Sequence, residues 1–178
     1  MARETRGLNH EVLAALGAAD GERILEVGFG HGRTLAEAAG AAPRAAFAGI
    51  DASAKAARVA ARRCRDAIAR GRIDLRVGDS AALPWPGGAF DKAFSVHTLY
   101  FWQEPRRDLG ELRRVLAPGG LVVLGFRERS DAAVATFPGY RFYTAEQLAE
   151  LLAAAGFHDL AVRPVSGDLR VARARTAR

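Results

Sequence analysis

Short apolar runs alternate with longer helical patterns along this chain, and no other feature constrains its fold as strongly. The apolar runs predict strands at residues 23–28, 45–50, 73–77, 90–96 and 121–126. The patterns with helical spacing predict helices at residues 9–18, 31–42, 53–70, 104–116 and 144–155. Pro118-Gly119-Gly120 is expected to stop the fourth helix, and Thr144 and Gln147 have the spacing of a capping box at the start of the fifth. This alternation predicts an α/β fold in which crossover helices cover a parallel sheet.

The last two apolar runs, at residues 157–165 and 169–174, break the alternation. The linker between them, Ser166-Gly167-Asp168, is too short for a crossover helix, so these runs predict an antiparallel hairpin. No repeat or domain linker stands out in the 178 residues. We therefore expect a single domain over 1–178, with a short helical region at 1–20 and a frayed tail at 173–178.

Composition limits the compartment and the partners. No apolar run approaches the roughly 20 residues that span a membrane, and residues 1–10 do not resemble a signal peptide. Cys64 is the only cysteine, which excludes an intrachain disulfide and a cysteine-based zinc site. These features favour a cytoplasmic protein with no metal and no membrane partner.

The net charge of +6 raises the alternative of a nucleic-acid partner. Only Lys55 and Lys92 are lysines among the 26 cationic residues, and the arginines are scattered along the chain. Abundant arginine and alanine are what a GC-rich genome produces. Specific binding of nucleic acid is therefore not expected.

A glycine-rich loop follows the first predicted strand. Gly28, Gly30 and Gly32 allow positive φ and close approach of a ligand, and the helix after them offers unpaired N–H groups. The dinucleotide fingerprint is G-x-G-x-x-G, whereas here the third glycine comes one position early. Glu26, two residues before the loop, suits a ligand with a cationic amino group and would oppose a pyrophosphate.

Two aspartates end the next two predicted strands. Asp51 can accept hydrogen bonds from both hydroxyls of a ribose, and its alternative role is a helix cap or a surface acid. Asp79 can face an amino-purine edge, and its alternative role is to form a turn. Together with the glycine loop, these acids indicate a nucleotide-like ligand that carries an amino group.

Five ordered segments carry a family resemblance: I-L-E-V-G-F-G-H-G, G-I-D-A-S, V-G-D-S-A-A-L-P-W, F-D-K-A-F-S-V-H-T-L-Y and L-R-R-V-L-A-P-G-G. They resemble the successive motifs of class I S-adenosylmethionine (SAM)-dependent methyltransferases, most closely the methyltransferase-domain type 11 family, over residues 22–126. The resemblance implies a Rossmann-like, doubly wound α/β/α sandwich. Its seven-stranded sheet would be mostly parallel with an antiparallel last strand, in agreement with the hairpin.

The resemblance also implies SAM as cofactor and a role for each motif residue. Glu26 and the backbone of the glycine loop would hold the methionine part, and the backbone of Ser95 would line the same side. Asp51 would bind the ribose, with Ala52 against the adenine. The implied cofactor-binding residues are Glu26, Gly28, Phe29, Gly30, Gly32, Asp51, Ala52, Asp79, Ser80 and Ser95.

The acceptor side carries weaker signals. Methyl transfer from a sulfonium needs alignment, and a general base only where the acceptor must lose a proton. His97 follows the fourth predicted strand and is the candidate base; its alternative is a hydrogen-bonded loop histidine. We predict that the acceptor contacts His97, Tyr100, Trp102, Tyr140 and Phe142. The rings of Tyr100-Phe101-Trp102 could equally pack under the next helix.

These features predict methyl transfer from SAM to a small or medium-sized organic acceptor, by a monomer or a homodimer. Methylation of RNA or protein and a non-catalytic SAM-binding module are the alternatives. Ser95-Val96-His97-Thr98 stands where amino-directed DNA methyltransferases have an Asn/Asp-Pro-Pro-aromatic segment, which argues against base N-methylation. About 20 residues precede the first predicted strand, so the acceptor site is expected to be open or completed by a second subunit.

Overall fold

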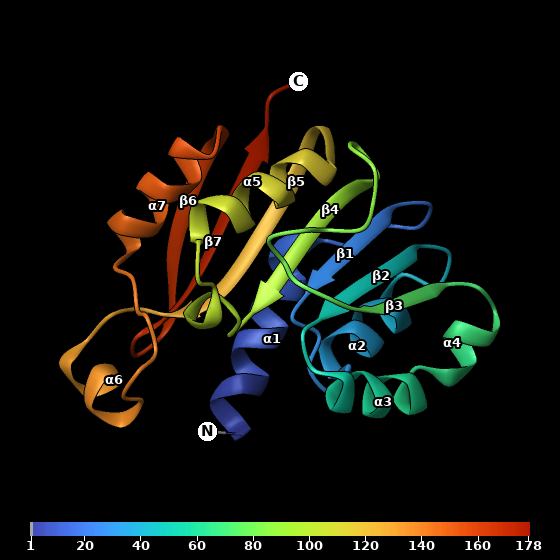
Figure 1. Ribbon diagram of the computed structural model, residues 1–178, viewed down its shortest axis with the longest axis horizontal. Helices are drawn as coiled ribbons and strands as arrows, with labels where there is room; N and C mark the ends of the chain where they lie inside the picture. The colour runs from blue at the N-terminus through green and yellow to red at the C-terminus, as the bar shows by residue number, and fades with distance from the viewer. Residues whose placement is uncertain (1) are drawn as a thin grey trace.

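The computed structural model describes residues 2–178 and contains one seven-stranded sheet (Figure 1). The strands are β1 (Arg23–Val27), β2 (Ala46–Asp51), β3 (Ile73–Val77), β4 (Phe90–Val96), β5 (Leu116–Arg127), β6 (Phe157–Ser166) and β7 (Leu169–Thr176). Their order is β3-β2-β1-β4-β5-β7-β6. Strands β1 to β5 pair in parallel, whereas β7 lies antiparallel between β5 and β6. The predicted Rossmann-like sheet with an antiparallel hairpin is confirmed.

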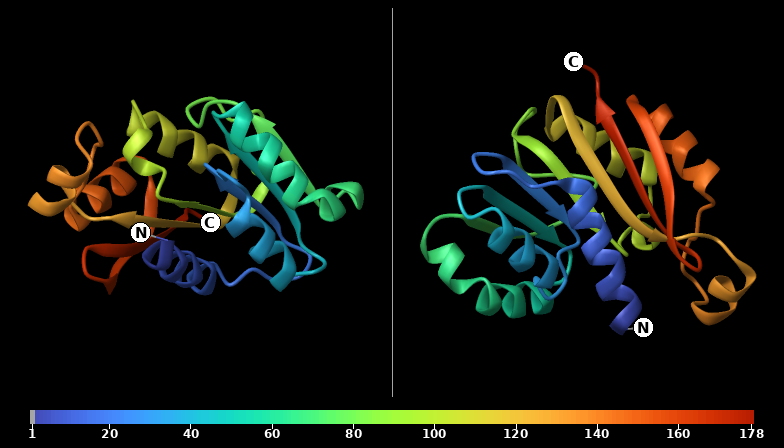
Figure 2. Two further views of the ribbon diagram at one scale, coloured as in Figure 1. Left: turned by 90° about the horizontal axis from the view of Figure 1, so that it is seen from below. Right: turned by 180° about the vertical axis from the view of Figure 1, so that it is seen from behind.

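Helices cover both faces of the sheet. They are α1 (Ala2–Leu16), α2 (Arg33–Ala41), α3 (Ala54–Arg63), α4 (Arg65–Ala69), the 3-10 turn η1 (Leu99–Phe101), α5 (Pro105–Val115), α6 (Asp131–Thr136) and α7 (Ala145–Ala154). Helices α1 and α2 bury Leu8, Val12 and Leu35 on one face, and α1 is seen crossing that face from behind in Figure 2. Helices α5 and α7 bury Leu109 and Leu148 on the other face. None of the described helices is long and apolar enough to cross a membrane.

The carboxyl ends of β1, β2 and β4 meet at one edge of the sheet, at the bottom of Figure 1. In open α/β sheets this edge is where ligands bind. Residues 78–89, between β3 and β4, contain no helix, and Trp85 packs its ring edge-on against Phe90 at 5.4 Å. The edge is therefore bordered by loops and by helices α1, α3 and α6.

The C-terminal tail does not fray as predicted. Arg173–Thr176 continue β7, where Arg175 pairs with Leu121 of β5 and Thr176 pairs with Phe157 of β6. Ala174 and Thr176 are buried. Because a strand on each side pairs with the backbone of β7, residues 173–176 are part of the sheet.

Other helix and strand boundaries also differ from the predicted ones. Pro118-Gly119-Gly120 does not stop the preceding helix but lies within β5, which begins at Leu116 and pairs there with Phe90. The register shifts between Phe90 and Lys92 and absorbs this irregular start. The predicted helix 53–70 turns at Cys64 into α3 and α4. Helix α1 begins earlier than predicted, and α6 was not predicted.

Candidate functional site

Two adjoining cavities lie at the carboxyl ends of β1, β2 and β4. The Asp51 cavity has a volume of about 540 Å³ and is lined mainly by the ends of β2, β3 and β4. The Glu26 cavity has a volume of about 370 Å³ and is lined by the glycine loop, Asn9 and Glu26. Four residues line both cavities: Gly28, Gly30, Val96 and His97. The two cavities therefore adjoin in one cleft with two arms, and we call the stretch that both arms share, with His97 in its wall, the bend of the cleft.

The glycine loop takes the backbone shape that its sequence predicts. Gly28, Gly30 and Gly32 have φ of +76°, +51° and +71°, in the left-handed region that favours glycine. A Cβ on Gly28 would stand 2.2 Å from Thr98 Oγ1, whereas no atom lies within 4 Å of a Cβ on Gly30. Gly28 is therefore needed by the fold, and Gly30 leaves space in the cleft. Phe29 packs its ring inward and is 4% exposed, so only its backbone can face a ligand.

Asp51 ties this loop to the helix after β2. Its Oδ2 accepts the N–H of Gly30 at 2.8 Å, and its Oδ1 accepts the N–H of Ser53 at 2.8 Å. Ser53, not Asp51, caps α3, because the Ser53 hydroxyl accepts the N–H of Ala56. Each Asp51 oxygen keeps a second lone pair, which can accept a ribose hydroxyl. Ala52 lines the same cavity.

Glu26 is a buried acid with an unmet hydrogen bond. Its side chain is 2% exposed, and Oε2 has no hydrogen-bond partner among the described residues. Burial raises the pKa of Glu26 well above 4.5, and the charges of Asp51 and Glu37 raise it further. An isolated buried carboxyl is costly, and a cationic amino group in the cavity would satisfy it. The site therefore fits a ligand with an ammonium group.

Asp79 and Ser80 line the far end of the Asp51 cavity. Asp79 Oδ1 accepts the N–H of Ala81 at 2.9 Å, so this residue also forms the turn that was its alternative role. The Ser80 hydroxyl lies 2.5 Å from Asp108 of α5. Asp108 is 2% exposed, and its burial raises its pKa. Sequence reasoning missed Asp108, although an acid on the apolar face of a helix was the available signal.

Two of the predicted cofactor residues, Gly32 and Ser95, line neither cavity. Gly32 is buried, and a Cβ on it would stand 2.8 Å from the Cβ of Ala60. Ser95 is the second of these residues. It is buried within β4, its hydroxyl has no partner among the described residues, and it lines neither cavity. Val96 and His97 take its place on the wall. Successive side chains of a strand point to opposite faces, and the chain turns sharply after β4. Val96 and His97, and not Ser95, therefore reach the surface of the cleft.

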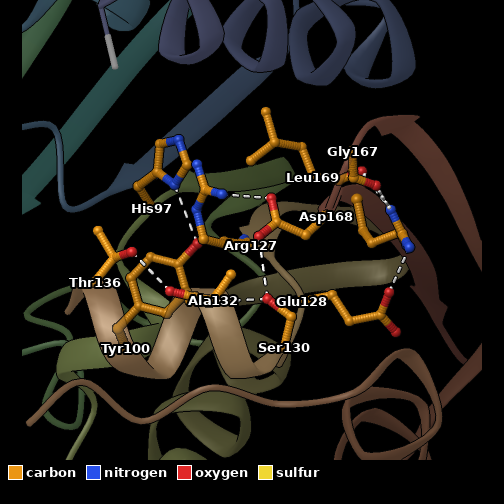
Figure 3. A network of polar contacts seen from close by, with 12 residues as sticks. His97, Tyr100, Arg127, Glu128, Ser130, Ala132, Thr136, Gly167, Asp168 and Leu169 are labelled. Atoms are coloured by element: carbon orange, nitrogen blue, oxygen red, sulfur yellow. Dashed lines mark hydrogen bonds and ion pairs between the residues drawn. The ribbon is translucent and has the colours of Figure 1, made fainter. Parts of the chain in front are cut away.

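His97 stands at the bend of the cleft with an unusual backbone. Its φ is +57°, a rare value for a residue other than glycine, and its N–H donates to the carbonyl of Gly125 at 2.9 Å. Its Nδ1 lies 3.1 Å from the hydroxyl of Tyr100 (Figure 3). His97 therefore lines the cleft where the two cavities adjoin, which is the position that its predicted role requires.

The aromatic side chains divide into buried and exposed sets. Tyr100 and Phe142 are buried with ring centroids 5.1 Å apart and line neither cavity. The place of Tyr100 is that of its packing alternative, and Phe142 lines a separate cavity with Tyr143. Trp102 is buried but lines the Asp51 cavity. Phe101, the middle residue of the Tyr100-Phe101-Trp102 run, is 54% exposed and lines that cavity. Tyr140 is 42% exposed, and its ring stands 4.9 Å from that of Phe101.

Metal ligation has no support in the part of the chain that the structure describes. Residues 2–178 hold no group of three or more histidine, cysteine, aspartate or glutamate side chains that could bind an ion. The cleft presents carboxyl, backbone amide, hydroxyl and imidazole groups to a ligand.

A parallel sheet with a glycine loop after β1 and a carboxylate at the end of β2 defines a nucleotide-binding protein of the Rossmann-like class. A family model described as "Methyltransferase domain" matches residues 25–124. The chain belongs to this family, and it is a class I SAM-dependent methyltransferase.

Known proteins of similar sequence and structure carry related names. The chain is 29% identical over 164 residues to the uncharacterized methyltransferase YdaC of Bacillus subtilis, covering 92% of this chain and 86% of that protein. It is 29% identical over 172 residues to the O-methyltransferase cnsE of Penicillium expansum, covering 92% of this chain and 62% of that protein. The crystal structure of the [4+2]-cyclase SpnF superposes with a TM-score of 0.84 at 27% identity, covering 96% of this chain and 80% of that one.

Proposed function

We propose that this protein transfers a methyl group from SAM to a small or medium-sized organic acceptor by in-line displacement. The observation that carries the proposal is the bent cleft, in which the Asp51 cavity and the Glu26 cavity meet at His97. SAM has a matching form, because a sulfonium joins its nucleoside to its amino acid. The bend is therefore the proposed place of the sulfonium and of the methyl group.

The two arms of the cleft suit the two halves of the cofactor. For the nucleoside half, Asp51 offers lone pairs to the ribose, and the proposed adenine contacts are Ala52, Asp79 and Ser80. For the amino-acid half, the unmet oxygen of Glu26 suits the ammonium. The backbone of residues 28–31 is proposed to hold the rest of the methionine, and Gly32 and Ser95 are left out because neither lines the cleft.

The chain's own contribution to the reaction is alignment. SAM supplies a methyl group that its positive sulfur already activates. The glycine loop and Asp51 fix the donor, and a well-aligned pair of reactants gains much of its rate acceleration from proximity alone. His97 is the proposed residue beside the acceptor, with the exposed faces of Phe101 and Tyr140 at the entrance.

The choice of a small acceptor rests on the cleft and on relatives. The name of cnsE, an O-methyltransferase, is consistent with an organic acceptor. The likeness to a [4+2]-cyclase means that a protein of this fold can be named for a reaction other than methyl transfer. Product formation must therefore be measured directly.

Two measurements test the proposal. Titration calorimetry should show micromolar to sub-millimolar binding of SAM or S-adenosylhomocysteine and weaker binding of NAD; preferential binding of NAD would overturn the assignment of the cleft. A screen with methyl-labelled SAM should then include phenols, carboxylic acids, alcohols, amines, bulk tRNA and a protein mixture. Label in a small molecule supports the proposal, and label only in RNA or protein overturns its acceptor half.

A further inference from the structure

The hydroxyl of Tyr100 makes a set of contacts that can be counted completely. Its oxygen accepts the backbone N–H of Arg127, and it lies 3.1 Å from Nδ1 of His97 (Figure 3). A phenol has one proton to donate, and a buried donor needs an acceptor. In the described part of the chain, Nδ1 of His97 is the one acceptor in contact with that proton.

The phenol keeps that proton under ordinary conditions. Tyr100 is 8% exposed, and burial raises its pKa despite the nearby Arg127. The opposite arrangement, in which Nδ1–H donates to the phenol oxygen, would leave the buried hydroxyl proton without an acceptor. Leaving a buried donor unpaired costs more than a hydrogen bond gains, so Tyr100 is the donor and Nδ1 the acceptor.

Tyr100 is held rigidly enough to impose this direction. Its ring packs against those of Phe142 and Tyr140, with centroids 5.1 Å and 6.0 Å apart. Tyr100 accepts the backbone N–H of Arg127. The side chain of Arg127 forms an ion pair with Asp168, in the turn between β6 and β7. Arg127 and Asp168 are thus charged groups near the pair that are matched to each other.

We infer that Tyr100 fixes neutral His97 as the tautomer with its proton on Nε2, so that His97 donates a hydrogen bond to the acceptor instead of removing a proton from it. This inference rests on the proposed function, and it replaces the general base expected at His97. Tyr100 is a positioning residue, because it acts through His97. An imidazole whose Nδ1 is occupied and whose Nε2 is protonated has no lone pair left to take a proton.

A hydrogen-bond donor at Nε2 of His97 favours one class of acceptor. A donor at the bend stabilises an oxygen that already bears negative charge, such as a carboxylate or the oxygen of an acidic phenol. The oxyanion's electron pair forms the new C–O bond, the S–CH₃ bond breaks with its pair on sulfur, and S-adenosylhomocysteine leaves. No proton moves, so no base is needed. An aliphatic alcohol or an ammonium would have to lose a proton and is a poor acceptor here.

Nuclear magnetic resonance reads the tautomer without any acceptor. Two-bond ¹H–¹⁵N spectra of the ¹⁵N-histidine protein, saturated with S-adenosylhomocysteine, report which ring nitrogen of each of the four histidines is protonated. The His97 signal is identified by its loss in His97→Gln. Wild type should show Nε2–H, and Tyr100→Phe should show a mixture of tautomers. Nδ1–H in the wild type would overturn the inference.

Tyr140→Phe is the matched control for that experiment. It removes a hydroxyl from the same aromatic cluster but not the contact to His97, so the His97 tautomer should stay unchanged. A shift as large as that of Tyr100→Phe would show that general loosening, and not the Tyr100 proton, sets the tautomer. Calorimetry of the same variants with S-adenosylhomocysteine should show binding, which separates failure here from failure of the proposed function.

Two substitutions of His97 test the donor role in catalysis. Glutamine places an amide N–H₂ near the position of Nε2, whereas asparagine places one near Nδ1. With the fastest acceptor from the screen, His97→Gln should keep kcat within about tenfold, and His97→Asn should lower it about a hundredfold. Asparagine tolerates φ of +57° better than glutamine, so backbone strain opposes this order. Equal loss in both variants, or alcohols as the fastest acceptors, would overturn the inference.

Discussion

The two walls of the cleft are built on different principles. The donor wall, at the ends of β1, β2 and β3, consists of left-handed glycines and carboxylates, and Glu26 Oε2 has no partner among the described residues. The acceptor wall, from η1 and residues 131–143, consists of aromatic rings that contact one another. Among the described residues, the donor wall leaves a carboxyl oxygen without a hydrogen-bond partner, whereas the acceptor side leaves only an indole N–H and a phenol hydroxyl, those of Trp102 and Tyr143.

This difference shows which structural features indicate each kind of ligand. A charged, hydrogen-bonding ligand leaves orphaned polar atoms and positive φ angles, because its site cannot be satisfied without it. An apolar ligand leaves only exposed rings, such as Phe101 at 54% and Tyr140 at 42%. The donor is therefore readable from this molecule in more detail than the acceptor.

The largest effect is expected for Gly28→Ala on the donor wall. The new Cβ would stand 2.2 Å from Thr98 Oγ1 at φ of +76°, so we expect a loss of about 2 kcal/mol or more in the free energy of unfolding. Affinity for S-adenosylhomocysteine should fall at least about a hundredfold. Urea unfolding and calorimetry measure the two losses.

Gly30→Ala is the control for stability at that loop. Its φ is +51°, and no atom lies within 4 Å of its Cβ, so only backbone strain of about 1 kcal/mol is expected. Equal urea midpoints for the two variants would show that the Thr98 contact does not limit this loop.

Asp51→Ala should have the next largest effect. It removes the acceptor for the N–H groups of Gly30 and Ser53 together with the proposed ribose contact. Charge-assisted hydrogen bonds contribute about 1.5–3 kcal/mol each, so affinity for S-adenosylhomocysteine should fall about a hundredfold by calorimetry. The control is Asp74→Ala, which removes an exposed acid paired with Arg76 on β3 and should leave the affinity for S-adenosylhomocysteine unchanged. Unaltered binding in Asp51→Ala would remove its ribose role.

Glu26→Gln should change the pH dependence of both stability and binding. Because the pKa of Glu26 is raised in the folded protein, the folded state holds a proton that the unfolded chain releases near pH 4.5. This contribution to stability is complete below that pH and is lost as pH rises through the folded pKa. Ligand-free wild type should therefore lose stability relative to Glu26→Gln as pH rises, measured by urea unfolding between about pH 5 and about pH 8.

Cofactor binding should report the same group. An ammonium beside Glu26 favours the carboxylate, so wild type should release a proton when it binds SAM, seen as a buffer-dependent enthalpy in calorimetry. Glu26→Gln should release none at this site. Binding heats that are independent of the buffer in wild type would place the ammonium elsewhere.

The smallest effect is expected for Phe101→Ala on the acceptor wall. Loss of one half-exposed ring should raise KM for an aromatic acceptor about tenfold and change SAM affinity less than about threefold. Val134→Ala, which trims another exposed apolar side chain on α6, serves as control. A fall in SAM affinity that matches the rise in KM would assign Phe101 to the donor wall.

Local patterns predicted the fold where local contacts decide it. The capping box of Thr144 and Gln147 is present at the start of α7 as expected, and the short linker 166–168 predicted the hairpin. Pairing between distant segments decided the rest. Pro118-Gly119-Gly120 looks like a helix stop but is drawn into β5 by β4. The tail looks unstructured because arginines fill its exposed positions, yet β5 and β6 hold it on both sides.

The residues of the site also divide into those that the sequence predicts and those that depend on contacts between distant segments. Glu26, Asp51 and Asp79 stand at strand ends, and a parallel sheet brings such positions together. Asp108 reaches Ser80 across 28 residues, and Tyr100 meets both His97 and Arg127 only after η1 has turned back onto β5. Such contacts depend on how one element packs on another, and spacing in the sequence does not contain that information.

The left-handed backbone of His97 limits what evolution or a designer can place at the bend of the cleft. Glycine, asparagine and aspartate accept φ of +57° readily, whereas valine, isoleucine and threonine do not. Asparagine and aspartate are each one nucleotide change away from histidine. Aspartate would put a carboxylate, and hence a proton acceptor, where the imidazole now stands. A single mutation at this position is therefore a short path to acceptors that must be deprotonated, while most other side chains are barred by the main chain.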